Sequence, residues 1–271
     1  MTADVVVERG KIDIGRVISE TVQVLGRNIV TFSILGLVLA GLPTAVVTFI
    51  QATTMRTAFG GLANGNVNVS GSYFEGVGIG GLTALITNAI LQGALIHATV
   101  QDLSGRKASV ADSLATGLRN FLPLIIVTIM FAVACGLGFI LLIVPGVMIA
   151  CAWCVVAPSV VADRTGILGA FGRSAELTRG NRWQIFGLGV LLFVIFVVLG
   201  TVFNALSGVS PFGRDPAAIA AQMTSPLFLV MMTIRQTIGA VIGSALVAVL
   251  YVQLRQAREG AGPEWLADVF S

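Results

Sequence analysis

The chain has 271 residues, of which 56% are hydrophobic and only 11% charged, and its net charge at pH 7 is +3. Soluble domains average roughly 25% charged residues, and a soluble protein of this length could not cover its surface with so few. The composition therefore excludes a soluble globular protein. Because the charges are sparse and form no basic arm, no nucleic-acid partner is expected.

Long stretches without a charged residue follow one another along the chain, at residues 28–55, 76–101, 120–162, 183–213 and 236–254. Crossing a bilayer takes about 20 apolar residues in a helix, and the third stretch is long enough to cross twice. The sequence predicts an all-α integral membrane protein with one membrane domain, residues 1–271. Six spans are expected, at 28–51, 76–100, 121–143, 146–162, 183–206 and 230–254.

The basic residues lie almost entirely on one side of this predicted topology. That side holds Arg9, Lys11, Arg16, Arg27, Arg106, Lys107, Arg119, Arg164, Arg173, Arg179, Arg182, Arg255 and Arg258. The other side holds Arg56 and Arg214. Because positive loops stay in the cytoplasm, both termini are expected in the cytoplasm of a bacterial inner membrane.

Apolar residues at helical spacing precede the first, third and fifth spans, for example Val17 and Leu25, Leu114 and Leu118, and Phe171. This pattern predicts three amphipathic helices along the cytoplasmic interface, at 1–27, 108–119 and 166–180. A capping box of Ser109 and Asp112 marks the start of the second helix.

Each predicted interfacial helix ends in a related group of residues, and a span follows at once. The three groups are Gly26, Arg27, Asn28; Leu118, Arg119, Asn120; and Gly180, Asn181, Arg182. We therefore expect three hairpins of transmembrane helices, each preceded by one cytoplasmic interfacial amphipathic helix. A cytoplasmic tail at 255–271 follows the last span.

The second half of the chain carries a set of residues that resembles a known family. The set is Pro145, Gly146, Pro158, Arg173, Ser174, Glu176, Leu177, Thr178, Arg179, Gly180, Arg255, Glu259 and Gly260. It resembles the membrane-domain family named after glycerophosphoryl diester phosphodiesterases. The resemblance implies a multi-span bacterial membrane protein. From the residues themselves, Pro145 and Gly146 are expected in a tight turn between two spans, and Pro158 inside the fourth span. The resemblance implies no activity, because the family's catalytic barrel is missing from this chain.

Three polar side chains within or beside the predicted spans are candidate site residues. Asn88 and Gln92 share one face of the second span and are expected either to bridge helices or to line a polar pathway. Arg235 is expected at the outer boundary of the last span. The alternative is a longer helix that begins at Ser225, with Arg235 turned inward to meet an anion.

Three basic residues at the ends of the predicted interfacial helices, Arg27, Arg119 and Arg182, are expected to anchor the topology at the headgroup level. Because guanidinium groups suit phosphate, these three and Arg235 are candidate contacts for an anion or a lipid headgroup. In the last span, Gly239 and Gly243 form a GxxxG pair that is expected to admit a neighbouring helix.

No residues form a catalytic pair, a metal cluster or a cofactor motif, so we expect neither an enzyme nor a cofactor. The leading hypothesis is a non-catalytic inner-membrane protein that acts through assembly or lipid contact at the cytoplasmic interface. Its expected partners are membrane lipids and either a membrane protein or further copies of itself. The alternative is a transporter or channel for a small anion or amphiphile, with a water-accessible cavity lined by Asn88, Gln92 and Arg235.

Overall fold

A computed structural model describes residues 11–62, 71–107, 109–163, 165–206 and 225–260, and within these ranges the ordered elements are all helical. The predicted structure of residues 1–10 and 261–271 lies outside this part of the chain. The helices are α1 (Ile14–Arg27), α2 (Ile29–Gly36), the π-helical turn η1 (Leu37–Gly41), α3 (Leu42–Leu62), α4 (Gly71–Leu103), α5 (Val110–Leu141), α6 (Ile143–Ala152), α7 (Val156–Asp163), α8 (Gly166–Thr178), α9 (Arg182–Leu206) and α11 (Pro226–Glu259).

Six helical segments of the described chain are long and apolar enough to cross a membrane. They are Ile29–Gln51, Gly78–Leu103, Val110–Leu141, Ile143–Asp163, Arg182–Leu206 and Pro226–Glu259. Each overlaps one of the six predicted spans. The grouping into hairpins and the position of further helices at the membrane surface remain predictions.

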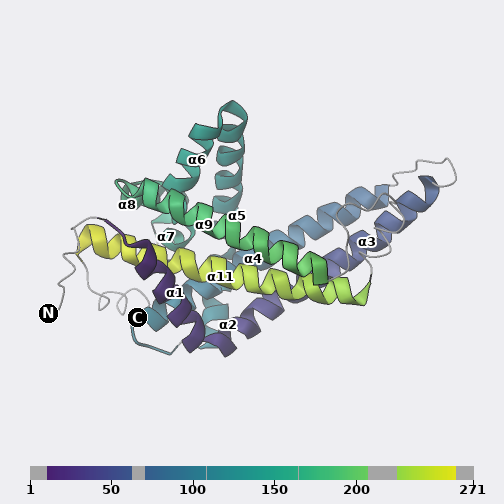
Figure 1. Ribbon diagram of the computed structural model, residues 1–271, viewed down its shortest axis with the longest axis horizontal. Helices are drawn as coiled ribbons and strands as arrows, with labels where there is room; N and C mark the ends of the chain where they lie inside the picture. The colour runs from purple at the N-terminus through teal and green to yellow at the C-terminus, as the bar shows by residue number, and fades with distance from the viewer. Residues whose placement is uncertain (1–10, 63–70, 108, 164, 207–224, 261–271) are drawn as a thin grey trace.

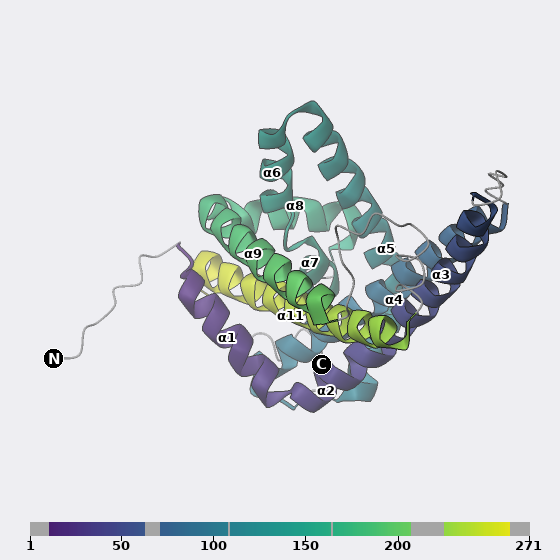
Figure 2. The ribbon, with the colours of Figure 1, turned by 45° about the vertical axis from the view of Figure 1, so that its right-hand side comes forward.

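The helices are arranged around α11, which runs through the middle of the molecule with α9 beside it and α1 across it (Figures 1 and 2). The pairs α3–α4 and α5–α6 extend from this centre in different directions in both views. Helices α1 and α8, the C-terminal ends of α4, α7 and α11, the N-terminal parts of α5 and α9 and the segments that join them carry most of the described charged residues. We call this region the charged end.

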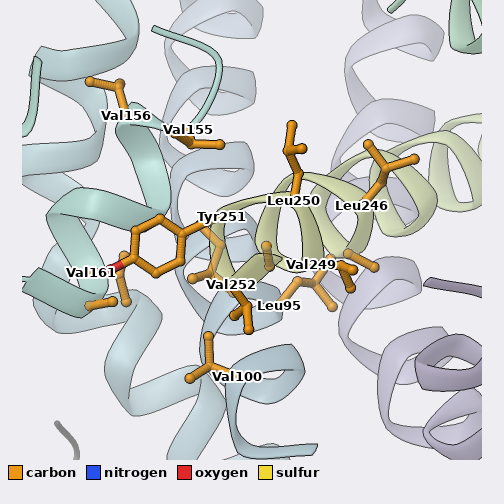
Figure 3. Packing of buried hydrophobic residues seen from close by; sticks show 14 of the residues in the cluster. Leu95, Val100, Val155, Val156, Val161, Leu246, Val249, Leu250, Tyr251 and Val252 are labelled. Carbon is orange, nitrogen blue, oxygen red and sulfur yellow. The ribbon is translucent and has the colours of Figure 1, made fainter. Parts of the chain in front are cut away.

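The best-buried side chains gather where α4, α7 and α11 meet. Figure 3 shows Leu95 from α4 and Val161 from α7 against Val249 and Tyr251 from α11. Tyr251 is the largest side chain with no exposure. Because burial is concentrated here, this junction is the rigid base that positions the polar residues of the charged end.

Away from this junction, large apolar side chains point outward. At the turn between α5 and α6, Ile140 is 82% exposed and Ile143 is 73% exposed. On α9, Phe193 is 69% exposed. In water such a surface would drive aggregation, whereas lipid solvates it at no cost. The outward-facing apolar residues therefore agree with the composition in requiring a membrane.

The first span begins at a break and contains a π-helical turn. α1 ends at Arg27, and Asn28 separates it from α2. The π-helical turn η1 ends at Gly41, two residues before Pro43, which has no N–H and whose ring would crowd the carbonyl of Leu39 in a regular α-helix. The wider π-helical turn accommodates the proline without ending the span.

At the third span the structure differs from the prediction. α5 runs without interruption from Val110 to Leu141, so no separate helix occupies 108–119. Ser109 caps this helix as expected, since its side chain accepts a hydrogen bond from the N–H of Asp112. The related residues Arg119 and Asn120 lie within the helix, where the Asn120 side chain donates to the carbonyl of Thr116.

The fourth span also differs, since it is divided into α6 and α7 by residues 153–155. Pro158 explains the interruption, because its ring would clash with the carbonyl of Cys154 four residues earlier. The turn before α6 is made by Leu142, whose backbone is extended. Pro145 and Gly146 therefore lie in the first turn of α6 rather than in the connection, and a proline there loses no hydrogen bond.

The last helix is longer than expected at both ends. α11 begins at Pro226, with Ser225 as its cap, and ends at Glu259, so it extends beyond the predicted span 230–254 and into the predicted tail. Ser225 accepts a hydrogen bond from the N–H of Phe228. Arg235 consequently lies inside the helix rather than at its start.

Candidate functional site

A network of charged side chains joins α7, α8 and α11 at the charged end. The carboxylate of Asp163, which is 8% exposed, accepts hydrogen bonds from Arg255 Nη1 at 2.7 Å, Arg173 Nε at 3.2 Å and the Tyr251 hydroxyl at 2.8 Å. Glu259 accepts from Arg255 Nε at 2.7 Å and from Arg173 Nη2. We call these five residues the clamp.

The clamp is balanced, with two guanidinium groups facing two carboxylates. Burial acts to lower the pKa of the Arg173 guanidinium, but the hydrogen bond to Glu259 and the charge of Asp163 outweigh burial and raise that pKa above its ordinary value. Glu176 lies 3.8 Å from Arg173 but is 70% exposed, so this ion pair contributes little to stability. Because the clamp groups satisfy one another, we interpret the network as structural.

Three further residues of the set that carries the family resemblance pack α8 against α6. Ser174 Oγ and Thr178 Oγ1 donate to the carbonyl of Ala152 at 2.9 and 3.1 Å, at the point where α6 ends. Leu177 between them is buried in the core. These hydroxyls replace the helical hydrogen bond that the break before α7 removes from Ala152.

Two glycines of the set lie just after helix ends. Gly180, between α8 and α9, has φ +91°, and Gly260 caps α11 with φ +64°. Both values are in the left-handed region that favours glycine. The carbonyl of Arg179 accepts a hydrogen bond from Arg258, which ties the end of α8 to the end of α11.

Arg27 and Asn28 converge on one carboxylate at the end of α4. Arg27 Nη2 lies 2.5 Å from Asp102 Oδ2, and Asn28 Nδ2 donates to Asp102 Oδ1 at 2.6 Å. The hydrogen bond to Asp102 raises the pKa of Arg27. Asn181, from the corresponding position before α9, is buried and accepts from the N–H of Ile12 at 3.0 Å.

A basic pocket of about 630 Å³ opens between α4 and α5 at the charged end. Three cationic residues line it: Arg106, Lys107 and Arg119. So do His97, Gln101, Ser109, Asp112, Ala115, Thr116, Asn120 and Val161. His97 is buried, with Nδ1 3.3 Å from Ser113 Oγ. Cations outnumber carboxylates in this lining, so the pocket favours an anion.

Arg182 lies at one end of a different, almost wholly apolar groove between α6 and α9. The groove has a volume of about 390 Å³ and includes Met148, Trp183 and Phe186. The Nε of Arg182 is buried and makes no hydrogen bond within the described chain. Trp183 is 84% exposed, as aromatic residues at membrane interfaces often are.

Asn88 and Gln92 on α4 lie near Arg235 on α11, where the three residues line adjoining cavities. Asn88 lines two neighbouring cavities of about 280 and 340 Å³. Gln92 lines the first and Arg235 the second. Arg235 thus lies where the longer-helix alternative expects it. The other three candidate arginines have separate surroundings: Arg27 in an ion pair, Arg119 in the basic pocket and Arg182 in the apolar groove.

Sequence reasoning missed three residues that organise the charged end. Asp163 and Asp102 are single carboxylates at the ends of predicted spans, on the side that carries most basic residues, and Tyr251 precedes Arg255 by one helical turn. The sequence does carry a signal for these positions: a carboxylate at the end of an apolar stretch, with arginines nearby in the chain. In the described chain, no three His, Cys, Asp or Glu residues gather as metal ligands would.

These features define a multi-span helical membrane protein. The chain belongs to the family described as a domain of unknown function, DUF7847, which matches residues 12–254. It is also similar to a protein named UPF0259 membrane protein, from the bacterium Pectobacterium carotovorum subsp. carotovorum, with 27% identity over 143 residues. That match covers 47% of this chain and 57% of the relative's length. No solved structure matches.

Neither comparison names the glycerophosphoryl diester phosphodiesterase membrane domain, so that resemblance remains a prediction. Its residues nevertheless have identifiable places in the structure. Arg173, Arg255 and Glu259 belong to the clamp. Ser174 and Thr178 bind the end of α6, and Gly180 follows α8 with a left-handed backbone.

Proposed function

We propose that the chain is a non-catalytic protein of the bacterial inner membrane that binds the phosphate groups of anionic lipids at its cytoplasmic side. The single observation that carries this proposal is the basic pocket between α4 and α5. In the proposed orientation, which follows the positive-inside rule, both termini and the charged end face the cytoplasm.

The chemistry of the pocket suits a phosphate headgroup. Arg106 and Lys107 come from the connection between α4 and α5, and Arg119 comes from the α5 helix. Guanidinium and ammonium groups donate charge-assisted hydrogen bonds to phosphate oxygens, and the amides of Gln101 and Asn120 add neutral donors. A cationic residue near an anionic membrane surface contributes about 1 kcal/mol of attraction.

Exposed apolar residues on neighbouring helices support a location at the membrane surface. Val22 on α1, Leu118 on α5 and Leu168 on α8 are 62%, 51% and 75% exposed. In the proposed arrangement, α1, α8 and the first turns of α5 lie at the cytoplasmic interface, each preceding one transmembrane hairpin. Their outward apolar side chains would then insert below the headgroups, where a second membrane protein or a further copy of the chain also has access.

Binding of phosphatidylglycerol tests the proposal. We expect the purified protein to bind this anionic lipid saturably by native mass spectrometry, and phosphatidylcholine only weakly. The double variant Lys107→Gln/Arg119→Gln is expected to bind phosphatidylglycerol at least about tenfold more weakly, since two attractions of about 1 kcal/mol are lost.

The matched control is Arg16→Gln/Arg179→Gln, which removes two exposed positive charges outside the pocket. It is expected to bind the lipid nearly as well as the natural chain. If both double variants lost the same amount of phosphatidylglycerol binding, net charge alone would explain the binding, and the pocket would be excluded as the binding site. Saturable competition by inorganic phosphate would instead identify a soluble phosphate as the ligand.

The alternative function, a transporter or channel for a small anion or amphiphile, is favoured by the two cavities that share Asn88. A pathway requires water to reach these cavities. With the three native cysteines replaced, we expect Asn88→Cys and Gln92→Cys to react with a membrane-impermeant thiol reagent under this alternative. Val133→Cys, at an outward-facing position, is the unreactive control. Absence of labelling at 88 and 92 from both sides would exclude the alternative.

A further inference from the structure

One positively charged side chain lies inside the apolar part of the bundle, against a cavity. The cavity, of about 340 Å³, lies between α4, α9 and α11. Its polar lining comes from Asn88, Arg235 and Gln236, and the remainder from Phe196, Leu199, Phe203, Ile238, Gly239 and Ala240. We propose that this cavity binds a small, single-tailed anionic amphiphile, with the anionic group at Arg235 and the tail against the α9 aromatic side chains.

The position of Arg235 along α11 places it well within the apolar region. Residues 226–234 precede it in the same helix and carry no charge, and they add about 13 Å of helix on its outer side at about 1.5 Å per residue. Another uncharged stretch, 236–254, separates it from Arg255 in the clamp. Arg235 is therefore flanked by hydrophobic helix on both sides.

The described residues satisfy the guanidinium of Arg235 poorly. Its Nη2 lies 3.1 Å from the sulfur of Met232, which is a weak acceptor. Its Nε is buried and makes no hydrogen bond, and no ion pair joins Arg235 to a described residue. A cation at such a depth costs on the order of 3 kcal/mol by insertion scales, and an anion bound beside it would offset that cost.

The remaining lining selects the class of ligand. Asn88 uses one N–H on the carbonyl of Ala84, at 2.8 Å, which leaves its other N–H and its oxygen for a ligand. Phe196, Leu199 and Phe203 on α9 offer an apolar wall for a tail. Because the volume is at the lower end of the roughly 300–1,000 Å³ range of ligand sites, a one-tailed molecule fits better than a two-tailed phospholipid.

This site is separate from the basic pocket, because the two share no lining residue. The proposal concerns binding alone and needs no transport step. The anionic group is an oxyanion, either a carboxylate or a phosphate monoester, and both carry oxygens that accept from a guanidinium.

Photolabelling of the full chain in phosphatidylcholine nanodiscs tests the proposal. The probe is a dodecanoic acid with a photoreactive diazirine in its tail, and the comparison probe is the corresponding alcohol. We expect the acid to label peptides from α9 and α11 saturably, and the alcohol to label them at least about tenfold less well. Competition with dodecanoate and with dodecyl phosphate identifies the preferred oxyanion.

Arg235→Gln is expected to reduce saturable labelling by the acid at least about tenfold, whereas Arg235→Lys keeps part of it. The Lys107→Gln/Arg119→Gln variant should label like the natural chain, so this result does not depend on the basic pocket. Elution volume and unfolding temperature verify that each variant is folded.

Three outcomes would overturn the proposal: equal labelling by acid and alcohol, labelling that survives Arg235→Gln, or no saturable labelling at all. The last outcome would mean that water alone solvates Arg235. Competition by inorganic phosphate as effective as that by dodecanoate would overturn the assignment of an amphiphile.

Discussion

Replacing Asp163 by alanine is expected to destabilise the protein more than any other single change in the clamp. Asp163 accepts hydrogen bonds from Arg173, Tyr251 and Arg255, whose removal would leave two guanidinium groups and a hydroxyl facing an apolar side chain. Breaking a buried ion pair by deleting one partner costs about 3–5 kcal/mol. We expect a clear drop in the apparent unfolding temperature of the purified protein in detergent.

Glu176→Ala is the control for Asp163→Ala, because Glu176 also faces Arg173 but is 70% exposed. An exposed pair contributes about 0–1 kcal/mol, so this variant should unfold close to the natural chain. Both changes remove one negative charge, and only the burial and the number of hydrogen bonds differ. If the two variants unfold at the same temperature, the clamp does not hold α7, α8 and α11 together.

The clamp also marks the limit of what the sequence alone predicts. The six spans can be predicted from the uncharged stretches, because a charged residue in lipid is costly wherever it occurs, whatever its neighbours in the fold. The pairing of Asp163 with Arg255 depends on how α7 and α11 pack, and 92 residues separate the two along the chain. Single-sequence patterns carry information about local periodicity and very little about such distant contacts.

Arg235 shows how one helix boundary decides a site. The 236–254 stretch is already long enough to span, which favours an outer-boundary position for Arg235. The structure starts α11 at Pro226, with Ser225 as the cap. Serine followed by proline at the first helical position is a start signal visible in the sequence, and greater weight on it would have placed Arg235 inside the helix.

The glycine pattern predicts close helix packing in general but not its location. Around Gly239 of the GxxxG pair, an added Cβ would meet only Phe196 at an ordinary 3.5 Å, and around Gly243 it would meet nothing within 4 Å. Tighter approaches occur elsewhere, for example at Gly93 and Gly117, between α4 and α5. Which small residues face a neighbour depends on the rotation of each helix, which the surrounding packing sets.

Gly117→Ala is expected to destabilise the α4–α5 contact strongly, even though alanine is the better helix former by about 1 kcal/mol. A Cβ at Gly117 would lie 2.3 Å from the carbonyl oxygen of Ile90 and 3.1 Å from the N of Ala94. Both are backbone atoms, so whole helices would have to move apart. Overpacking costs typically 1–3 kcal/mol, and we expect at least this loss in thermal unfolding, with Gly117→Leu failing to accumulate in the membrane.

Gly136→Ala, on the same helix, should act in the opposite direction. No atom lies within 4 Å of a Cβ there, so only the gain in helix propensity remains, and the variant should be as stable as the natural chain or slightly more so. Because the basic pocket opens between the same two helices, Gly117→Ala should also weaken binding of phosphatidylglycerol, whereas Gly136→Ala should not. Equal behaviour of the two variants would mean that α4 and α5 do not meet at Gly117.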